Sequence, residues 1–258
     1  MVNIRTSVCY LRGAIMEIKT KHEKYANYKT KKQLAEEGLM PSGKGVELWT
    51  NGSCSATAIY YDATKATKIT ELYIWQDYYT SDHGLVTVGI GAVDQLGNVI
   101  FDELVKPESK WLKDENNAER WLEGARHADY SASEIVLARP LATVSKKLSN
   151  AVSKLEDVKT LVSYNIDYNI PDALRNKYQE VDVMELFANV IKEPMYAVDE
   201  TYAYTDEDWK NNDVKRNFVG YKWQKLSKCL DHYHVKLKGN KACDYADAIR
   251  HAYQKMNK

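Results

Sequence analysis

The sequence predicts an α/β protein in which helices flank a mixed sheet, with a small accessory module at residues 1–68 and a main domain at 69–258. The first observation is a pair of apolar strands, 85–93 (LVTVGIGAV) and 99–105 (VIFDELV), joined by the turn DQLGN. This pattern indicates an antiparallel hairpin. The second is that strands alternate with helical patterns further along the chain, which is typical of parallel strands. The third is a change from a Lys- and Glu-rich composition to apolar strands at the module boundary.

The accessory module is expected to contain one helix and one hairpin. Residues 31–37 have helical character, and Gly38 follows them as a C-terminal cap would. Two strand-like stretches, 46–50 and 56–61, flank the dipeptide Asn51-Gly52. Because this dipeptide is a strong turn signal, we expect the two stretches to pair.

The main domain is expected to begin with a strand over residues 71–75 (ELYIW), just before the hairpin. The stretch from about 192 to 221 has no clear period and many Tyr, Asp and Asn residues, so we interpret it as a long loop or insertion. The other expected elements are helices over 116–125 and 141–155, a strand over 160–165 followed by a helix through 178, a strand over 181–184, and helices over 185–191, 223–234 and 241–257.

Charge and hydropathy restrict the class of protein. The 36 Lys and Arg residues balance 36 Asp and Glu residues, which excludes a strongly basic nucleic-acid coat and an acidic tail protein. No apolar run approaches the roughly 18 residues of a membrane span, and the N-terminus lacks a signal-peptide pattern. We therefore expect a cytoplasmic protein with no membrane partner. The cysteines at positions 9, 54, 229 and 243 are far apart and are expected to be free thiols.

Three blocks of sequence follow one another in the main domain. The first is LYIWQDYYT at 72–80, continued by VGIGAV at 88–93 and a hairpin at 94–107. The second is YNIDYN at 164–169, and the third is NKACDYA at 240–246. In order and spacing the blocks resemble those of the DnaQ-like (RNase T-like, DEDDh) 3′→5′ exonucleases. This resemblance implies a ribonuclease H-like mixed sheet flanked by helices.

The resemblance also implies a catalytic site that this sequence has not kept. The family holds two Mg²⁺ ions with four carboxylates and uses a His as general base. In the direct alignment, the two carboxylate positions of the first block fall on Gln76 and Tyr78. A shift of this block by one residue would place Trp75 and Asp77 there instead. Neutral side chains bring no charge to a metal pair, so the resemblance implies a pseudoenzyme with a degenerate site and no metal. Without the shift, the five family positions are occupied by Gln76, Tyr78, Asn169, Asn240 and Tyr245.

The alternative is a divergent 3′→5′ exonuclease that uses Mg²⁺ or Mn²⁺ in a relocated site. Four aspartates lie beside the substituted positions, namely Asp77, Asp167, Asp244 and Asp247. A slip of one residue on a strand turns a side chain to the opposite face, and on a helix it rotates the side chain by about 100°. Several compensations would therefore be needed. Convergence of three of these carboxylates at the end of the first strand would support the enzyme hypothesis.

Candidate binding residues favour a non-catalytic module for single-stranded DNA or RNA, or for a protein. Asn165 and His83 lie close in sequence to the expected site. In the insertion, aromatic residues are interleaved with Lys210, Lys215 and Arg216, a mixture that suits stacking on bases. The insertion also has many acidic residues, which repel phosphates, so a protein partner bound by its Tyr-rich surface is the competing hypothesis.

Overall fold

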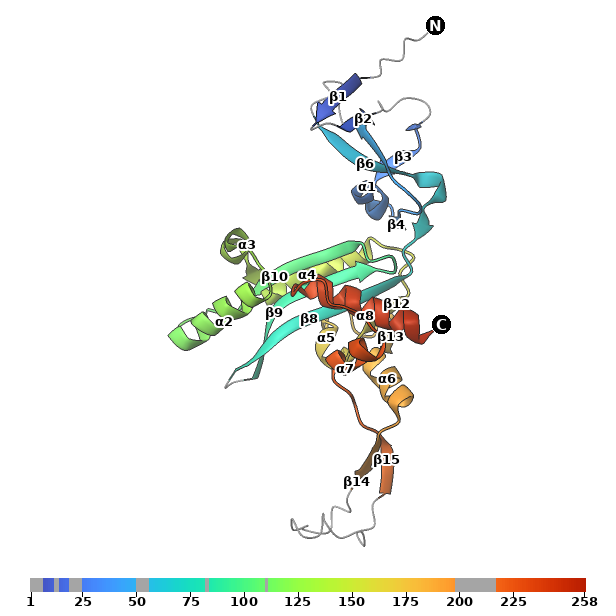
Figure 1. Cartoon of the computed structure of the whole chain (residues 1–258). Helices are drawn as coiled ribbons and strands as arrows, with labels where there is room; N and C mark the ends of the chain where they lie inside the picture. The colour runs from blue at the N-terminus through green and yellow to red at the C-terminus, as the bar shows by residue number, and fades with distance from the viewer. Residues whose placement is uncertain are drawn as a thin grey trace.

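The computed structural model describes residues 7–11, 14–18, 25–49, 56–81, 84–109, 111–197 and 217–258. Within these residues the main sheet has six strands in the order β11-β10-β9-β8-β12-β13 (Figure 1). Strands β8, β9 and β10 are antiparallel neighbours, whereas β12 runs parallel to β8 and β13 runs parallel to β12. The predicted α/β class with a mixed sheet is therefore confirmed. The strands are β8 (Glu71–Ser81), β9 (Gly84–Asp94), β10 (Val99–Lys106), β11 (Arg139–Pro140), β12 (Thr160–Ser163) and β13 (Gln179–Asp182).

Helices cover both faces of the main sheet, with α8 in front of it and α4 behind it in Figure 1. Successive residues of a strand point to opposite faces, and β8 follows this rule. Leu72 packs with Leu148 of α4, whereas Tyr73 packs with Ile249 of α8. None of the described helices is long and apolar enough to cross a membrane. The helices of the main domain are α2 (Glu115–His127), α3 (Ala132–Leu137), α4 (Leu141–Ser153), α5 (Ile166–Asn169), α6 (Val183–Ile191), α7 (Leu226–His232) and α8 (Ala242–Met256).

Most predicted elements occur, but the helix expected after residue 165 and through 178 is wrong. Only the single turn α5 forms there, because Pro171 follows it closely and Asn176 adopts a left-handed backbone angle, with φ of 61°. Left-handed residues and proline both interrupt a helix. Helix α3 was not predicted, although Ser131 and Glu134 form a capping box at its start.

The N-terminal part contains the predicted helix and the predicted hairpin. Val46–Trp49 pairs antiparallel with Thr57–Asp62, while the expected turn at Asn51-Gly52 lies outside the described residues. Tyr25, Leu48 and Tyr60 form a small core of their own, but Met40 is buried in the main core beside Leu72. The elements are β1 (Ser7–Leu11), β2 (Ala14–Ile18), β3 (Tyr28–Thr30), α1 (Lys31–Glu36), β4 (Leu39–Met40), β5 (Val46–Trp49), β6 (Thr57–Asp62), the short 3-10 helix η2 (Ala63–Lys65) and β7 (Thr67–Lys68).

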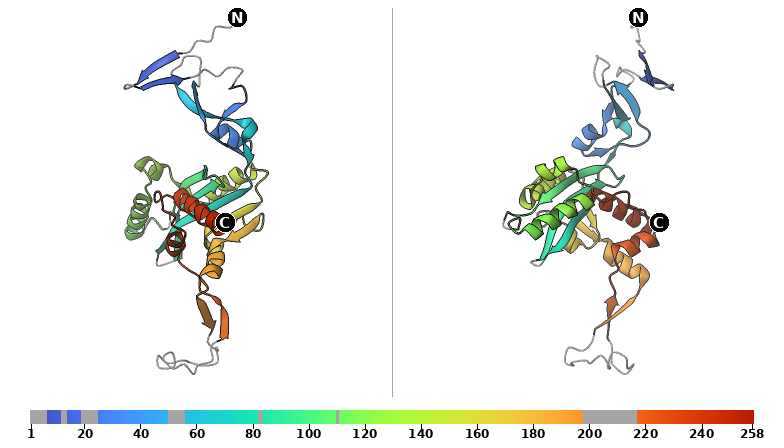
Figure 2. Two further views of the ribbon diagram at one scale, coloured as in Figure 1. Left: turned by 45° about the vertical axis from the view of Figure 1, so that its right-hand side comes forward. Right: turned by 60° about the vertical axis from the view of Figure 1, so that its left-hand side comes forward.

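The insertion near residues 192–221 is not wholly a loop. Its two ends, β14 (Pro194–Ala197) and β15 (Asn217–Tyr221), pair as antiparallel strands, and the pair extends away from the main sheet in Figure 2. Residues 198–216 lie outside the described residues, and so does His83. The binding roles predicted for Lys210, Lys215, Arg216 and His83 therefore stay predictions.

Candidate functional site

The three sequence blocks meet at the C-terminal end of β8. Strand β12 pairs with β8 only as far as Tyr73, so the next backbone groups of β8 need other partners. The side chain of Asn169 supplies one, because its Oδ1 accepts a hydrogen bond of 3.1 Å from the backbone N–H of Gln76. The Asn169 amide also donates to the carbonyl of Tyr164 at 2.6 Å, and the residue is only 1% exposed. Asn169 thus holds α5 against the end of β8.

Asn165 turns the chain from β12 into α5. Its positive φ of 62° gives the sharp change of direction, and asparagine tolerates this conformation better than most residues. The carboxylate of Asp182 then accepts hydrogen bonds from the backbone N–H groups of Asn165, at 2.9 Å, and Ile166, at 3.2 Å. In the structure, Asn165 therefore orients α5 through its backbone.

On the face of β8 that α8 covers, the rings of Trp75 and Tyr245 stack at 5.4 Å between centroids and 15° between planes. Helix α8 comes this close because Gly91 of β9 has no side chain under it. Strand alternation places Asp77 on the same face as Trp75, whereas Gln76 and Tyr78 line a groove on the other face. Of the two alignments of the first block that the sequence left open, Gln76 and Tyr78 do not share a face with Tyr245. The shifted positions, Trp75 and Asp77, share its face.

Asp77 is partly buried on the face of β8 that α8 covers. Burial raises the pKa of its carboxyl, and a hydrogen bond from the backbone N–H of Tyr78 and the charge of His127 offset part of that rise. The pKa of Tyr245 is also raised, first by burial and then by the charge of Asp77. Asn240 lies apart from this pair and donates to Asp129 at 3.3 Å from both its backbone N–H and its side chain. Of Trp75, Asp77, Asn169, Asn240 and Tyr245, only Asp77 carries a carboxylate.

The four substitute aspartates lie in four different settings. Asp167 is exposed and pairs with Arg175 at 3.1 Å. Asp244 accepts a hydrogen bond of 3.1 Å from the backbone of Lys241 at the start of α8. Asp247 is buried against Arg250 and Lys238, each at 2.6 Å. The described residues contain no group of three His, Cys, Asp or Glu placed to hold a metal.

The two cysteines with described side chains are buried and free, as predicted, and lie on the α8 face of the sheet. Burial raises the pKa of both Cys229 and Cys243 to about 12. A thiol with such a pKa is protonated at neutral pH, and only the thiolate is strongly nucleophilic. These two side chains therefore act as small apolar core residues.

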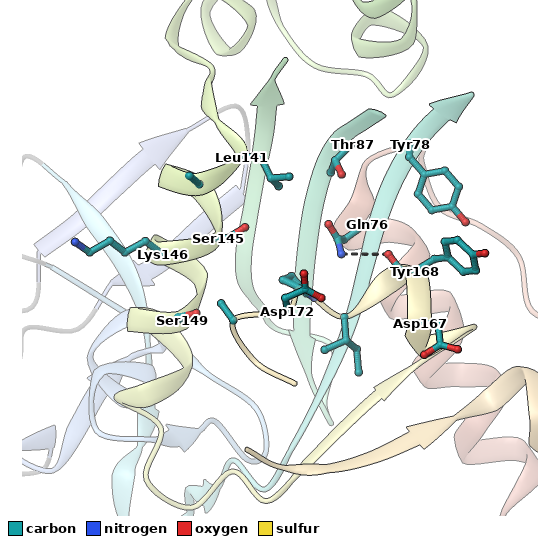
Figure 3. Close-up of a pocket in the computed structure, with 14 residues that line it drawn as sticks. Gln76, Tyr78, Thr87, Leu141, Ser145, Lys146, Ser149, Asp167, Tyr168 and Asp172 are labelled. Atoms are coloured by element: carbon teal, nitrogen blue, oxygen red, sulfur yellow. Dashed lines mark hydrogen bonds between the residues drawn. The ribbon is translucent and has the colours of Figure 1, made fainter. Parts of the chain in front are cut away.

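A groove of about 610 Å³ lies on the α4 side of the end of β8, as Figure 3 shows. Gln76, Tyr78 and Thr87 come from β8 and β9, and α4 forms the facing wall. The α4 wall of the groove was not predicted from the sequence. The pattern that could have indicated it is the pair Ser145 and Ser149, which lie four residues apart on one helix face. The other lining residues are Leu141, Ala142, Lys146, Asp167, Tyr168, Ile170, Pro171, Asp172 and Ala173.

No protein-family model and no curated protein matches this chain.

The lining of the groove combines aromatic rings with neutral polar groups. The rings of Tyr78 and Tyr168 lie 6.4 Å apart between centroids, and Tyr168 is 53% exposed. The hydroxyl of Ser149 is buried and has no hydrogen-bond partner among the described residues. Gln76 donates its amide to the carbonyl of Tyr168 at 3.2 Å, which holds the floor of the groove in place.

The charges around the groove nearly cancel. Among the described residues that line it, Lys146 is the one cation, and Asp167 and Asp172 are the anions. Arg175, just outside the lining, lies 3.1 Å from Asp167 and 3.8 Å from Asp172 and so offsets part of their charge. The groove can therefore accept a ligand that stacks and forms hydrogen bonds without being strongly charged at the point of contact.

Proposed function

We propose that this protein is a non-catalytic binding module with a ribonuclease H-like, DnaQ-like fold, and that its groove at the end of β8 binds single-stranded nucleic acid. The order of the main sheet supports the fold, because a three-stranded antiparallel meander is extended by two parallel strands beside its first strand. The meeting of all three sequence blocks at the end of β8 supports it independently.

The observation that carries the non-catalytic part is the ring stack of Trp75 and Tyr245. These rings occupy the positions where the resemblance implies two metal-binding carboxylates. Two adjacent Mg²⁺ ions need negatively charged oxygen ligands to offset their mutual repulsion. The stack supplies none, and Asn169 uses its side chain to hold the backbone of Gln76.

The groove supplies the elements of a single-strand site. Exposed aromatic rings give a surface on which bases of any sequence can stack. Tyr168 and Tyr78 form such a surface, and the amide of Gln76 lies beside it. Lys146 lies on the α4 wall, and its side chain, which points away from the groove in Figure 3, must turn to meet one phosphate. We therefore expect binding dominated by stacking, with a small ionic contribution.

Replacing Tyr168 with alanine is expected to weaken binding of a fluorescent single-stranded oligonucleotide by about 1–3 kcal/mol, because one stacked base loses its platform. Fluorescence anisotropy measures the affinity for DNA and RNA versions of the same sequence. Trp223→Ala is the matched control, since Trp223 is 66% exposed and lies outside the groove. Equal losses in the two variants, or no binding by the unaltered protein at low salt, would refute the nucleic-acid site.

A further inference from the structure

A second cavity, of about 580 Å³, lies where the N-terminal helix α1 approaches the main domain. Its walls are α1, the turn between β9 and β10 with the start of β10, and the C-terminal end of α4. The cavity shares no lining residue with the groove at the end of β8. Its lining residues are Lys31, Lys32, Ala35, Glu36, Gly97, Asn98, Val99, Ile100, Ala151, Lys154 and Leu155.

The cavity carries an excess of positive charge. Lys31, Lys32 and Lys154 line it, against a single acid, Glu36. The ammonium group of Lys31 lies 5.9 Å from the ring centroid of Tyr61. Those of Lys32 and Lys154 make no ion pair or hydrogen bond within the described part of the chain. Unpaired cations on two walls of one cavity favour a ligand with a negative group.

The rest of the lining is largely apolar. Val99, at the start of β10, is 57% exposed, and it lies beside Ile100 and Leu155. Ala35 of α1 and Ala151 of α4 add small side chains on the two walls. Covering exposed apolar side chains with an apolar ligand group is favourable, because it removes their surface from water. The ligand should therefore have an aliphatic body as well as an anionic group.

We infer that this cavity binds a small anionic amphiphile, with a carboxylate or phosphate head group at the lysines and an aliphatic chain over Val99 and Ile100. The volume falls within the range of small-molecule sites, about 300–1,000 Å³. The inference is independent of the nucleic-acid proposal, because the two cavities are lined by different residues.

Isothermal titration calorimetry of the full chain tests the inference with three probes of equal chain length: decanoate, decyl phosphate and decyltrimethylammonium, each below its micellar concentration. One or both anions should bind, and the cation should bind at least about tenfold more weakly, since the lysines repel it. Preference between the two anions identifies the head group. Absence of anion binding, or equal binding of the cation, overturns the inference.

Variants locate the site. Lys154→Glu should weaken anion binding by about fivefold or more, because it replaces an attraction with a repulsion at close range. The control Lys113→Glu makes the same charge change at an exposed residue outside the cavity and should leave the affinity unchanged. Val99→Ser should also weaken binding, whereas Val136→Ser, at a residue 80% exposed on α3, should not. Equal effects of Lys154→Glu and Lys113→Glu would place the ligand elsewhere.

Discussion

Replacing Asp247 with alanine is expected to lower the free energy of unfolding by about 3–5 kcal/mol, because the change leaves a buried cation without its partner. Asp247 and Arg250 are 7% and 6% exposed, and two nitrogens of Arg250 donate to one Asp247 oxygen at 2.9 and 2.6 Å. Lys238 donates to the other oxygen at 2.6 Å. Through Arg250, the network also reaches the carbonyl of Gln95 in the turn between β9 and β10.

Urea unfolding followed by circular dichroism measures this loss. The control is Asp157→Ala, which removes a more exposed ion pair with Lys68 and should cost less than about 1 kcal/mol. The double variant Asp247→Leu, Arg250→Met should be more stable than Asp247→Ala, because it leaves no unpaired buried charge. Similar stabilities of Asp247→Ala and Asp157→Ala would contradict the role given to the network.

Acid should weaken the same network. Burial alone would raise the pKa of Asp247, but hydrogen bonds from Lys238 and Arg250 outweigh burial and hold the pKa below its ordinary value. A carboxyl with a lowered pKa in the folded protein contributes stability above its unfolded pKa of about 3.9, and that contribution is lost as the pH falls below it. The unaltered protein should therefore lose more stability than Asp247→Ala when the pH falls from about 5 to 3.

Replacing Gly91 with alanine is expected to cost about 3 kcal/mol or more, because the added methyl group would overlap the backbone of α8. It would lie 2.6 Å from the Cα of Cys243 and closer still to the Ala242–Cys243 peptide group. A helix backbone cannot move aside as a flexible side chain can. A displacement of α8 away from β9 would also separate the stacked rings of Trp75 and Tyr245.

Thermal unfolding checks this second prediction. The control is Gly124→Ala in α2, where a new methyl group would meet only Val88 at a comfortable 3.7 Å. Alanine is also the better helix former, so Gly124→Ala should stabilise the protein by up to about 1 kcal/mol. A Gly91→Ala protein as stable as the Gly124→Ala protein would mean that α8 does not press against β9 at this residue.

Local patterns in the sequence were enough to predict the main sheet. Alternating apolar residues and the DQLGN turn predicted β9 and β10, and the three sequence blocks lie on β8, α5 and the start of α8. Local reasoning failed at Asn165, which was expected to end a strand, because its left-handed angle depends on Asp182, a residue 17 positions away that binds its backbone. Such a partner is visible only in three dimensions.

The candidate site was harder to predict than the fold. Which face Gln76 takes depends on where α8 crosses β8, and that crossing depends on the missing side chain of Gly91. The α4 wall of the groove comes from Ser145, Lys146 and Ser149, which belong to no recognisable motif. Their role arises because α4 packs beside the end of β8, far from it in sequence.

The most direct test of the proposed function is one gel measurement on a 5′-labelled single-stranded oligonucleotide of about 16 nucleotides, the upper site size of common single-strand binders. The protein is incubated with it in Mg²⁺, in Mn²⁺ and in EDTA, and each sample is run on a native and a denaturing gel. We predict a retarded band on the native gel in all three samples and a full-length strand on the denaturing gel. Stepwise shortening of the strand in Mg²⁺ or Mn²⁺ but not in EDTA would contradict the proposal and restore the exonuclease alternative.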